Sequence, residues 1–145
     1  YKVILMSFKE FMIEEAEQEL VEYVASKRFK DAEGNPIKWK IRPLTTKEND
    51  AIRKQCYIKT QVPGKRGQYT KDFDSAKYLL MVAEKCVVYP NLHDKDLQDF
   101  YHVMGIEDLL KEHLLKVPGE YDDFTAKLQE INGYDIEEAV EEAKN

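Results

Sequence analysis

The stretch "KWKIRPLTTKEND", residues 38–50, carries a strand pattern that stops at a proline and a helix pattern that follows it. Trp39 and Ile41 share one face of the predicted strand. The residues that alternate with them are cations: Lys38, Lys40 and Arg42. Such an alternation is compatible with a nucleic-acid platform, with the edge of an active site, or with a half-buried hairpin.

The residues before this stretch predict a partner strand. The run "EYVASKRF", residues 22–29, has Tyr23, Ala25 and Phe29 in alternation, and "DAEGNP", residues 31–36, is rich in turn-forming residues. We therefore expect a β-hairpin over residues 22–43. It should end at Pro43, because the residue before a proline is held in an extended conformation.

After the hairpin the pattern becomes helical. Thr45 and Glu48 have the spacing of a capping box, which predicts a helix that begins after Thr45 and extends to Cys56 or Tyr57. A loop is expected in "QVPGKRGQYTKDF", residues 61–73. The next segment, residues 74–90, has the most apolar helical pattern and should form the central helix, closed by Pro90. Its apolar face is predicted to contain Ala76, Leu79, Leu80, Ala83, Val87 and Val88.

Further helices are expected at residues 94–103, 106–115, 118–131 and 135–145, with Asp94 and Pro118 at two of their starts and Asn132–Gly133 at one end. The predicted fold is mainly α, in the α+β class: an N-terminal β-hairpin packed on a compact bundle of five or six short helices. Residues 1–21 should form an acidic amphipathic helix, mobile when the protein is alone. Residues 22–145 should form a single α-rich domain. Tyr1–Leu5 are expected to be an extension, because "MSFKEFMIEE" resembles a natural start.

Charge is segregated along the chain, whose net charge is −6. Residues 27–71 contain 13 Lys and Arg against 4 Asp and Glu, a balance of +9, whereas residues 92–145 contain 5 against 15, a balance of −10. This asymmetry indicates either separate binding faces or attraction between the two halves of the chain.

Known catalytic and metal-binding motifs are missing from the sequence. The three histidines lie outside HExxH spacing, and "PGKRG" lacks the Ser or Thr that a phosphate loop uses to hold magnesium. Cys56 and Cys86 lie in apolar patterns and are expected to be buried thiols. No apolar run has the length of a membrane span. We therefore expect a protein that is not an enzyme, needs no cofactor or metal, and does not bind membranes.

Two surfaces are candidates for binding a partner. The first is the outer part of the hairpin with its neighbouring loop: Arg28, Lys40, Arg42, Lys65, Arg66 and Tyr69. The second is the N-terminal helix through Phe8, Phe11 and Met12, if they lack partners within the domain. The basic hairpin and the loop at residues 64–71 leave a nucleic-acid-binding regulator as the alternative function. The acidic pI of about 5.2 makes that alternative less favourable.

Several segments resemble the XkdN-like tail assembly chaperones of tailed phages and prophages of Gram-positive bacteria. The most specific are "SKRF", "GNPI" followed by "W" and "IRP", "CVVYPNL", "LQD" followed by "VMG", and "EINGYD". The resemblance runs from about residue 23 to the end and keeps the order of every block.

The resemblance implies a non-enzymatic protein in the cytoplasm of the bacterial host, absent from the mature virion. Its implied partner is the tape-measure protein, which it would keep soluble while the tail tube assembles. The tail tube protein and a longer, frameshifted form of the chain are further candidate partners. The resemblance supplies no catalytic residues and does not say whether the chain self-associates. A structural tail subunit is a third hypothesis, which mass spectrometry of purified particles would separate from a chaperone.

Overall fold

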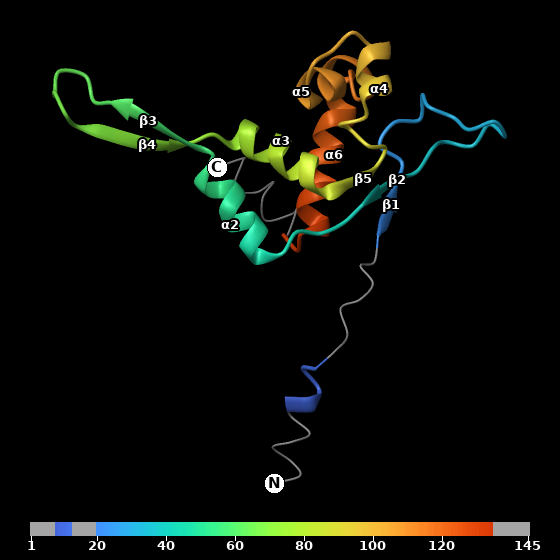
Figure 1. Cartoon of the computed structure of the whole chain (residues 1–145), viewed down its shortest axis with the longest axis horizontal. Coiled ribbons are helices and arrows are strands. Elements are labelled where there is room, and N and C mark those ends of the chain that lie inside the picture. The colour runs from blue at the N-terminus through green and yellow to red at the C-terminus, as the bar shows by residue number, and fades with distance from the viewer. Residues whose placement is uncertain (1–7, 13–19, 135–145) are drawn as a thin grey trace.

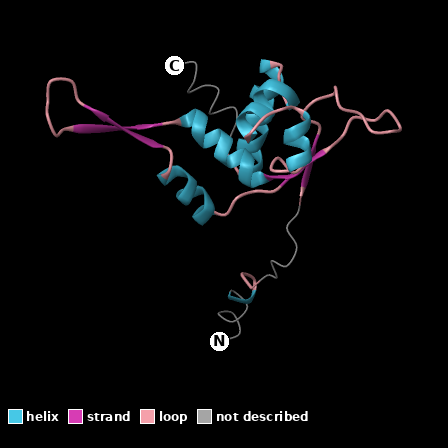
Figure 2. Ribbon diagram, turned by 45° about the horizontal axis from the view of Figure 1, so that its top comes forward, coloured by secondary structure: helices cyan, strands magenta, loops and turns pink. Residues whose placement is uncertain are grey.

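The computed structural model describes residues 8–12 and 20–134 (Figure 1). A small sheet and a group of helices form the body, and a two-stranded hairpin projects from one side of it (Figures 1 and 2). The α+β class expected from the sequence is therefore confirmed. The expected helices at residues 1–21 and 135–145, and the extension Tyr1–Leu5, lie wholly or largely outside the described residues.

Strand β2 (Trp39–Ile41) is the centre of a three-stranded sheet, between β1 (Val21–Tyr23) and β5 (Val87–Tyr89). β1 and β2 are antiparallel, with Tyr23 opposite Trp39. The two runs expected to pair do so, but the first strand lies earlier than the alternation of residues 22–29 predicted. Between the strands the chain makes an irregular excursion that closes with a single bridge, Lys30 to Pro36.

The third strand of this sheet replaces the expected end of the central helix. That helix stops at Cys86, and Val87–Tyr89 is extended and pairs with β2. Two valines and a tyrosine favour a strand over a helix. The otherwise unpaired edge of β2 supplies the hydrogen-bond partners, and the Arg42 N–H donates to the Cys86 carbonyl at 2.9 Å. Pro90 therefore follows a strand rather than closing a helix.

The helices follow from capping signals in the sequence. In α2 (Thr46–Lys54), the Glu48 N–H donates to the Thr45 hydroxyl and the Thr45 N–H donates to the Glu48 carboxylate, which confirms the capping box. The other helical elements are α3 (Ser75–Cys86), α4 (Lys95–Phe100), α5 (Ile106–Asp108), η1 (Leu109–Leu114) and α6 (Pro118–Ile131). Asp94 caps α4 and Pro118 lies in the first turn of α6, as expected.

The segment expected as one helix over residues 106–115 is divided. A short turn of α-helix, α5, continues into η1, a π-helix. The wider π geometry appears in the bond from the Leu115 N–H to the Leu110 carbonyl, at 2.7 Å. Leu109, Leu110 and Leu115 are all at most 1% exposed, so this local winding accompanies the burial of adjacent leucines.

Helix α3 contacts both α2 and α6, so it is central, as predicted. Its buried side chains are Tyr78, Val82, Ala83 and Cys86, a stripe with helical spacing. The expected face was only partly right. Leu79 and Leu80 are half-buried and Ala76 is exposed, because contact with helices on two sides rotates the buried stripe toward Tyr78 and Val82.

Trp39 joins the sheet to the helices. Its side chain is 3% exposed and meets the Phe124 ring of α6 edge to face, with ring centroids 5.4 Å apart. Ile41 is fully buried beside it, whereas Lys40 between them is exposed. The apolar face of this strand therefore lies inward and its basic face outward, as the alternation predicted.

Candidate interaction surface on the projecting hairpin

The hairpin that leaves the body is formed by β3 (Tyr57–Gln61) and β4 (Tyr69–Phe73), and residues 57–73 are called the arm below (Figures 1 and 2). The end of a helix and a loop were expected there from the sequence, and that prediction was wrong. Helix α2 stops at Lys54. The runs "YIKTQ" and "YTKDF" are rich in aromatic and β-branched residues, which favour paired strands.

Two glycines form the tip of the arm. The Lys65 N–H donates to the Val62 carbonyl at 3.1 Å, and the Gln68 N–H donates to the Lys65 carbonyl at 3.3 Å. Gly64 and Gly67 occupy the third positions of these successive turns, with φ of 75° and 83°. Left-handed backbone at the third position is the requirement of a type II turn, which glycine meets without strain.

The register separates the arm into two faces of different chemistry. Side chains that pair across the strands lie on the same face, and faces alternate along each strand. One face, called the aromatic–basic face, carries Tyr57, Lys59, Gln61, Tyr69, Lys71 and Phe73. The opposite face carries Ile58, Thr60, Thr70 and Asp72. Every residue of both strands is exposed.

The aromatic–basic face is ordered by contacts among its own side chains. The rings of Tyr57 and Phe73 meet edge to face, with centroids 5.3 Å apart. The Lys59 ammonium lies 4.5 Å from the centroid of the Tyr69 ring, within the range of a cation–π contact. Even so, Tyr57 and Tyr69 keep 53% and 51% of their surface exposed. The face therefore presents large apolar area beside positive charge.

The arm is positively charged on an acidic chain. Residues 57–73 contain 4 Lys and Arg and 1 Asp, a charge of +3, so the rest of the chain carries −9. Within residues 8–12 and 20–134, none of the six ion pairs involves a cation of the arm. The positive charge of the arm is therefore not neutralised by an ion pair with these residues, and it is available to an acidic partner.

The base of the arm is fixed to the body. The Asp74 N–H donates to the Cys56 carbonyl at 2.6 Å, and the Lys77 ammonium donates to the Gln55 carbonyl at 3.0 Å. The Phe73 ring packs against Tyr78 of α3, with centroids 5.5 Å apart. The arm is therefore held at its base, and the ring contacts given above for Tyr57, Lys59 and Tyr69 are with other residues of the arm.

Arg28, expected on the exposed part of the first hairpin, makes contacts within the chain. Its guanidinium donates to the carbonyls of His113 and Leu114 at 3.1 and 3.0 Å and lies 3.4 Å from the Glu120 carboxylate. Cations at the end of a helix satisfy its last carbonyls. Arg28 therefore ties the excursion after β1 to η1 and α6.

Arg42 also has a partner inside the chain. Its guanidinium donates to both carboxylate oxygens of Glu48, at 3.1 and 3.0 Å. The hydrogen bonds from Arg42, with that from the Thr45 N–H, lower the pKa of Glu48 from 4.5 to about 2. The pair joins the end of β2 to the first turn of α2, which gives Arg42 a structural role.

The remaining predicted residues do not form one surface. Lys65, Arg66 and Tyr69 lie on the arm, and Lys40 lies on the outer face of the sheet at the other side of the body (Figure 1). Phe8, Phe11 and Met12 are 60%, 84% and 75% exposed, in a segment below the sheet. Sequence reasoning missed Tyr57, Lys59, Lys71 and Phe73, although the alternation within "YIKTQ" and "YTKDF" indicates their shared face.

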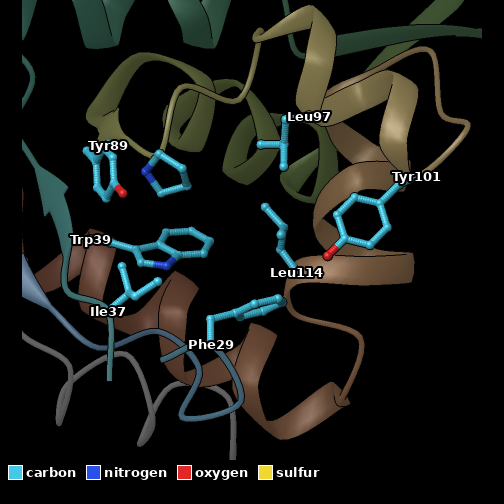
Figure 3. Close-up of a pocket in the computed structure, with 8 residues that line it drawn as sticks. Phe29, Ile37, Trp39, Tyr89, Leu97, Tyr101 and Leu114 are labelled. Atoms are coloured by element: carbon cyan, nitrogen blue, oxygen red, sulfur yellow. The ribbon is translucent and has the colours of Figure 1, made fainter. Parts of the chain in front are cut away.

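An apolar pocket of about 180 Å³ lies between the sheet and the helices α4 and η1. Figure 3 shows its side chains around a common centre, with Trp39 and Tyr89 on the sheet side and Leu97 and Tyr101 on the other. Its lining is completed by Phe29, Ile37, Pro90 and Leu114. The lining has no ionisable acid or base apart from the tyrosines, so the pocket suits an apolar side chain.

Among the residues that the structure describes, no three His, Cys, Asp or Glu come together in a way that could hold a metal ion. No helix among them is long and apolar enough to cross a membrane. Cys56 and Cys86 are buried free thiols, as expected, and burial raises the pKa of both.

A small α+β body that carries an exposed, charged arm has the form of a protein that acts through contacts with other proteins. The chain belongs to the phage XkdN-like tail assembly chaperone proteins, whose family model matches residues 8–144.

Two relatives and one solved structure illustrate the family. The XkdN protein of the phage-like element PBSX of Bacillus subtilis strain 168 is 37% identical over 131 residues, which cover 89% of this chain and 86% of the relative. The uncharacterized protein YqbN of the same strain shows the same identity and coverage. A crystal structure of YqbN superposes with a TM-score of 0.69 at 31% identity, over 86% of this chain and 94% of that one.

Proposed function

We propose that this chain is a non-enzymatic tail assembly chaperone that binds the tape-measure protein and keeps it soluble while the tail tube assembles. Family membership over residues 8–144 is the observation that carries the proposal. The chain would act in the cytoplasm of the bacterial host and be absent from the finished particle. The tail tube protein and a longer, frameshifted form of the chain are further proposed partners.

The physical basis is the protection of exposed apolar surface. A long helical chain exposes an apolar stripe until it is enclosed, and such stripes bind amphipathic partners or aggregate. The arm supports the proposal because it offers apolar rings and positive charge outside the body, where they can reach a large partner. Arg28 and Arg42, with partners inside the chain, are left out of the proposed contact surface.

The test is co-expression with a tape-measure protein of the phage or prophage from which this chain comes. The tape-measure protein should remain in the soluble fraction when this chain is present and aggregate when it is omitted. Equal solubility with and without this chain would contradict the proposal. Detection of the chain in purified particles by mass spectrometry would favour a structural tail subunit instead.

A further inference from the structure

We propose that the aromatic–basic face of the arm binds an acidic amphipathic segment of a partner protein. Carboxylates of that segment lie between Lys59 and Lys71, and its apolar side chains lie against Tyr57, Tyr69 and Phe73. The inference rests on the proposed function only in taking the arm as a contact surface. It adds the chemical class of the segment that is recognised.

The pairing of Lys59 with Lys71 carries the argument. They are directly opposite each other in the register, and like charges at such positions destabilise a hairpin. The Val62 N–H donates to the Gln68 carbonyl, and bonded pairs alternate with non-bonded pairs along the ladder. Lys59 and Lys71 therefore form a non-bonded pair, the type in which side chains approach most closely. A partner carboxylate placed between the two ammonium groups removes this repulsion.

Apolar groups enclose the lysine pair along the face. Tyr57 and Phe73 form the cross-strand pair on one side of it, and Gln61 with Tyr69 forms the pair on the other. Along the arm, the face thus presents aromatic rings, then the lysine pair, then an aromatic ring again. A five-residue strand is roughly 17 Å long, about the rise of three turns of an α-helix, so it matches a short amphipathic helix.

An acidic polypeptide fits the face better than a nucleic acid does. The Tyr69 ring is already in contact with the Lys59 ammonium, and the Tyr57 and Phe73 rings pack edge to face on each other. These contacts limit the open ring faces that bases need for stacking.

The experiment uses the full chain and synthetic fluorescent probes at low salt. The first is a helical peptide with leucine on one face and glutamate beside it, and the second has lysine in place of each glutamate. The third is a single-stranded oligothymidine. Binding is measured by fluorescence anisotropy for the wild type, K59Q/K71Q and K65Q/R66Q. The two variants change the net charge equally, but only the first alters the aromatic–basic face.

The wild type should bind the glutamate peptide more tightly than either other probe. K59Q/K71Q should weaken that binding about fivefold, as expected for the loss of two exposed charge contacts, and K65Q/R66Q by less than about twofold. K59E/K71E should bind the lysine peptide more tightly than the wild type does. The circular dichroism spectrum of each variant should match that of the wild type, which shows that the altered chain still folds.

Equal losses in K59Q/K71Q and K65Q/R66Q would overturn the inference, because charge alone would then explain the binding. Tighter binding of oligothymidine than of the glutamate peptide would overturn it in favour of nucleic acid. No tape-measure protein is present in this assay. Failure here therefore leaves the proposed chaperone function standing, and failure of the solubility test leaves the peptide specificity standing.

Discussion

Arg42 and Glu48 form a two-pronged ion pair that joins the end of β2 to the start of α2. The same glutamate completes the capping box with Thr45, so one carboxylate serves two contacts. Arg28 similarly uses one guanidinium to hold two helix-terminal carbonyls. These cations are part of the fold, whereas Lys59 and Lys71 are free of such partners among the described residues.

The Glu48 contacts predict a pH dependence of stability. Because the folded pKa is about 2 and the ordinary value is 4.5, the contribution is present above pH 4.5 and is lost as pH falls toward 2. For this partly exposed pair we expect about 1 kcal/mol. Urea unfolding of the wild type and Glu48→Gln should differ by that amount at pH 6 and converge as pH falls through about 2. A difference that stays constant down to pH 2 would contradict this account.

Phe124 should be among the residues most sensitive to truncation. It is fully buried and contacts Trp39, so it links α6 to the sheet. Phe124→Ala should lower the free energy of unfolding by about 3–5 kcal/mol, through lost burial and the cavity that remains. Chemical denaturation monitored by circular dichroism measures the effect. Phe100→Ala, at a ring that is 72% exposed, is the matched control and should change little.

At the scale of elements, capping residues in the sequence predicted where helices begin better than where they end. The capping box at Thr45, the cap at Asp94 and Pro118 in the first turn are side-chain events within one turn, so the sequence carries them directly. The end of α3 depends on a strand that is distant in the sequence, because Val87–Tyr89 pairs with β2 in the sheet. That competition between helix and sheet cannot be seen in a window of neighbouring residues.

The arm was missed for a different reason. Its strands have the residue types of a hairpin, but its turn sequence "VPGKRGQ" also fits an open loop. An exposed hairpin also lacks the one-sided burial that makes a strand pattern clear. The predicted binding residues Lys65, Arg66 and Tyr69 lie on it, while four residues of its aromatic–basic face were assigned to a helix end and a loop.

Hydrogen exchange should distinguish the arm from the body. A two-stranded hairpin without a third strand or a covering helix is marginally stable, so its amides should open locally. We expect amides of residues 58–72 to exchange faster than those of α3 and α6, measured by mass spectrometry after proteolysis. Protection of the arm equal to that of α3 would mean that the arm is held by contacts beyond those at its root.

For the whole molecule, the charge asymmetry seen in the sequence becomes a spatial arrangement. The arm carries +3 at one end of a molecule that otherwise carries −9. The class of fold and the family were both predictable, because the helical periodicity and the segments that resemble the family extend over most of the chain. The contact surface was less predictable, since it depends on which cations the folded body uses for itself.

The most direct test compares the wild-type chain with an arm-shortened chain during co-expression with the tape-measure protein. In the shortened chain an Asn-Gly turn replaces residues 59–71, which keeps the Ile58–Asp72 pair and the anchored root. Both chains should melt at similar temperatures, because the contacts between the arm and the rest of the described residues that are given above lie at its base, which the shortened chain keeps. The account predicts that the wild type keeps the tape-measure protein in the soluble fraction and the shortened chain does not. A shortened chain that is folded and equally effective would contradict the claim that the arm is the contact surface.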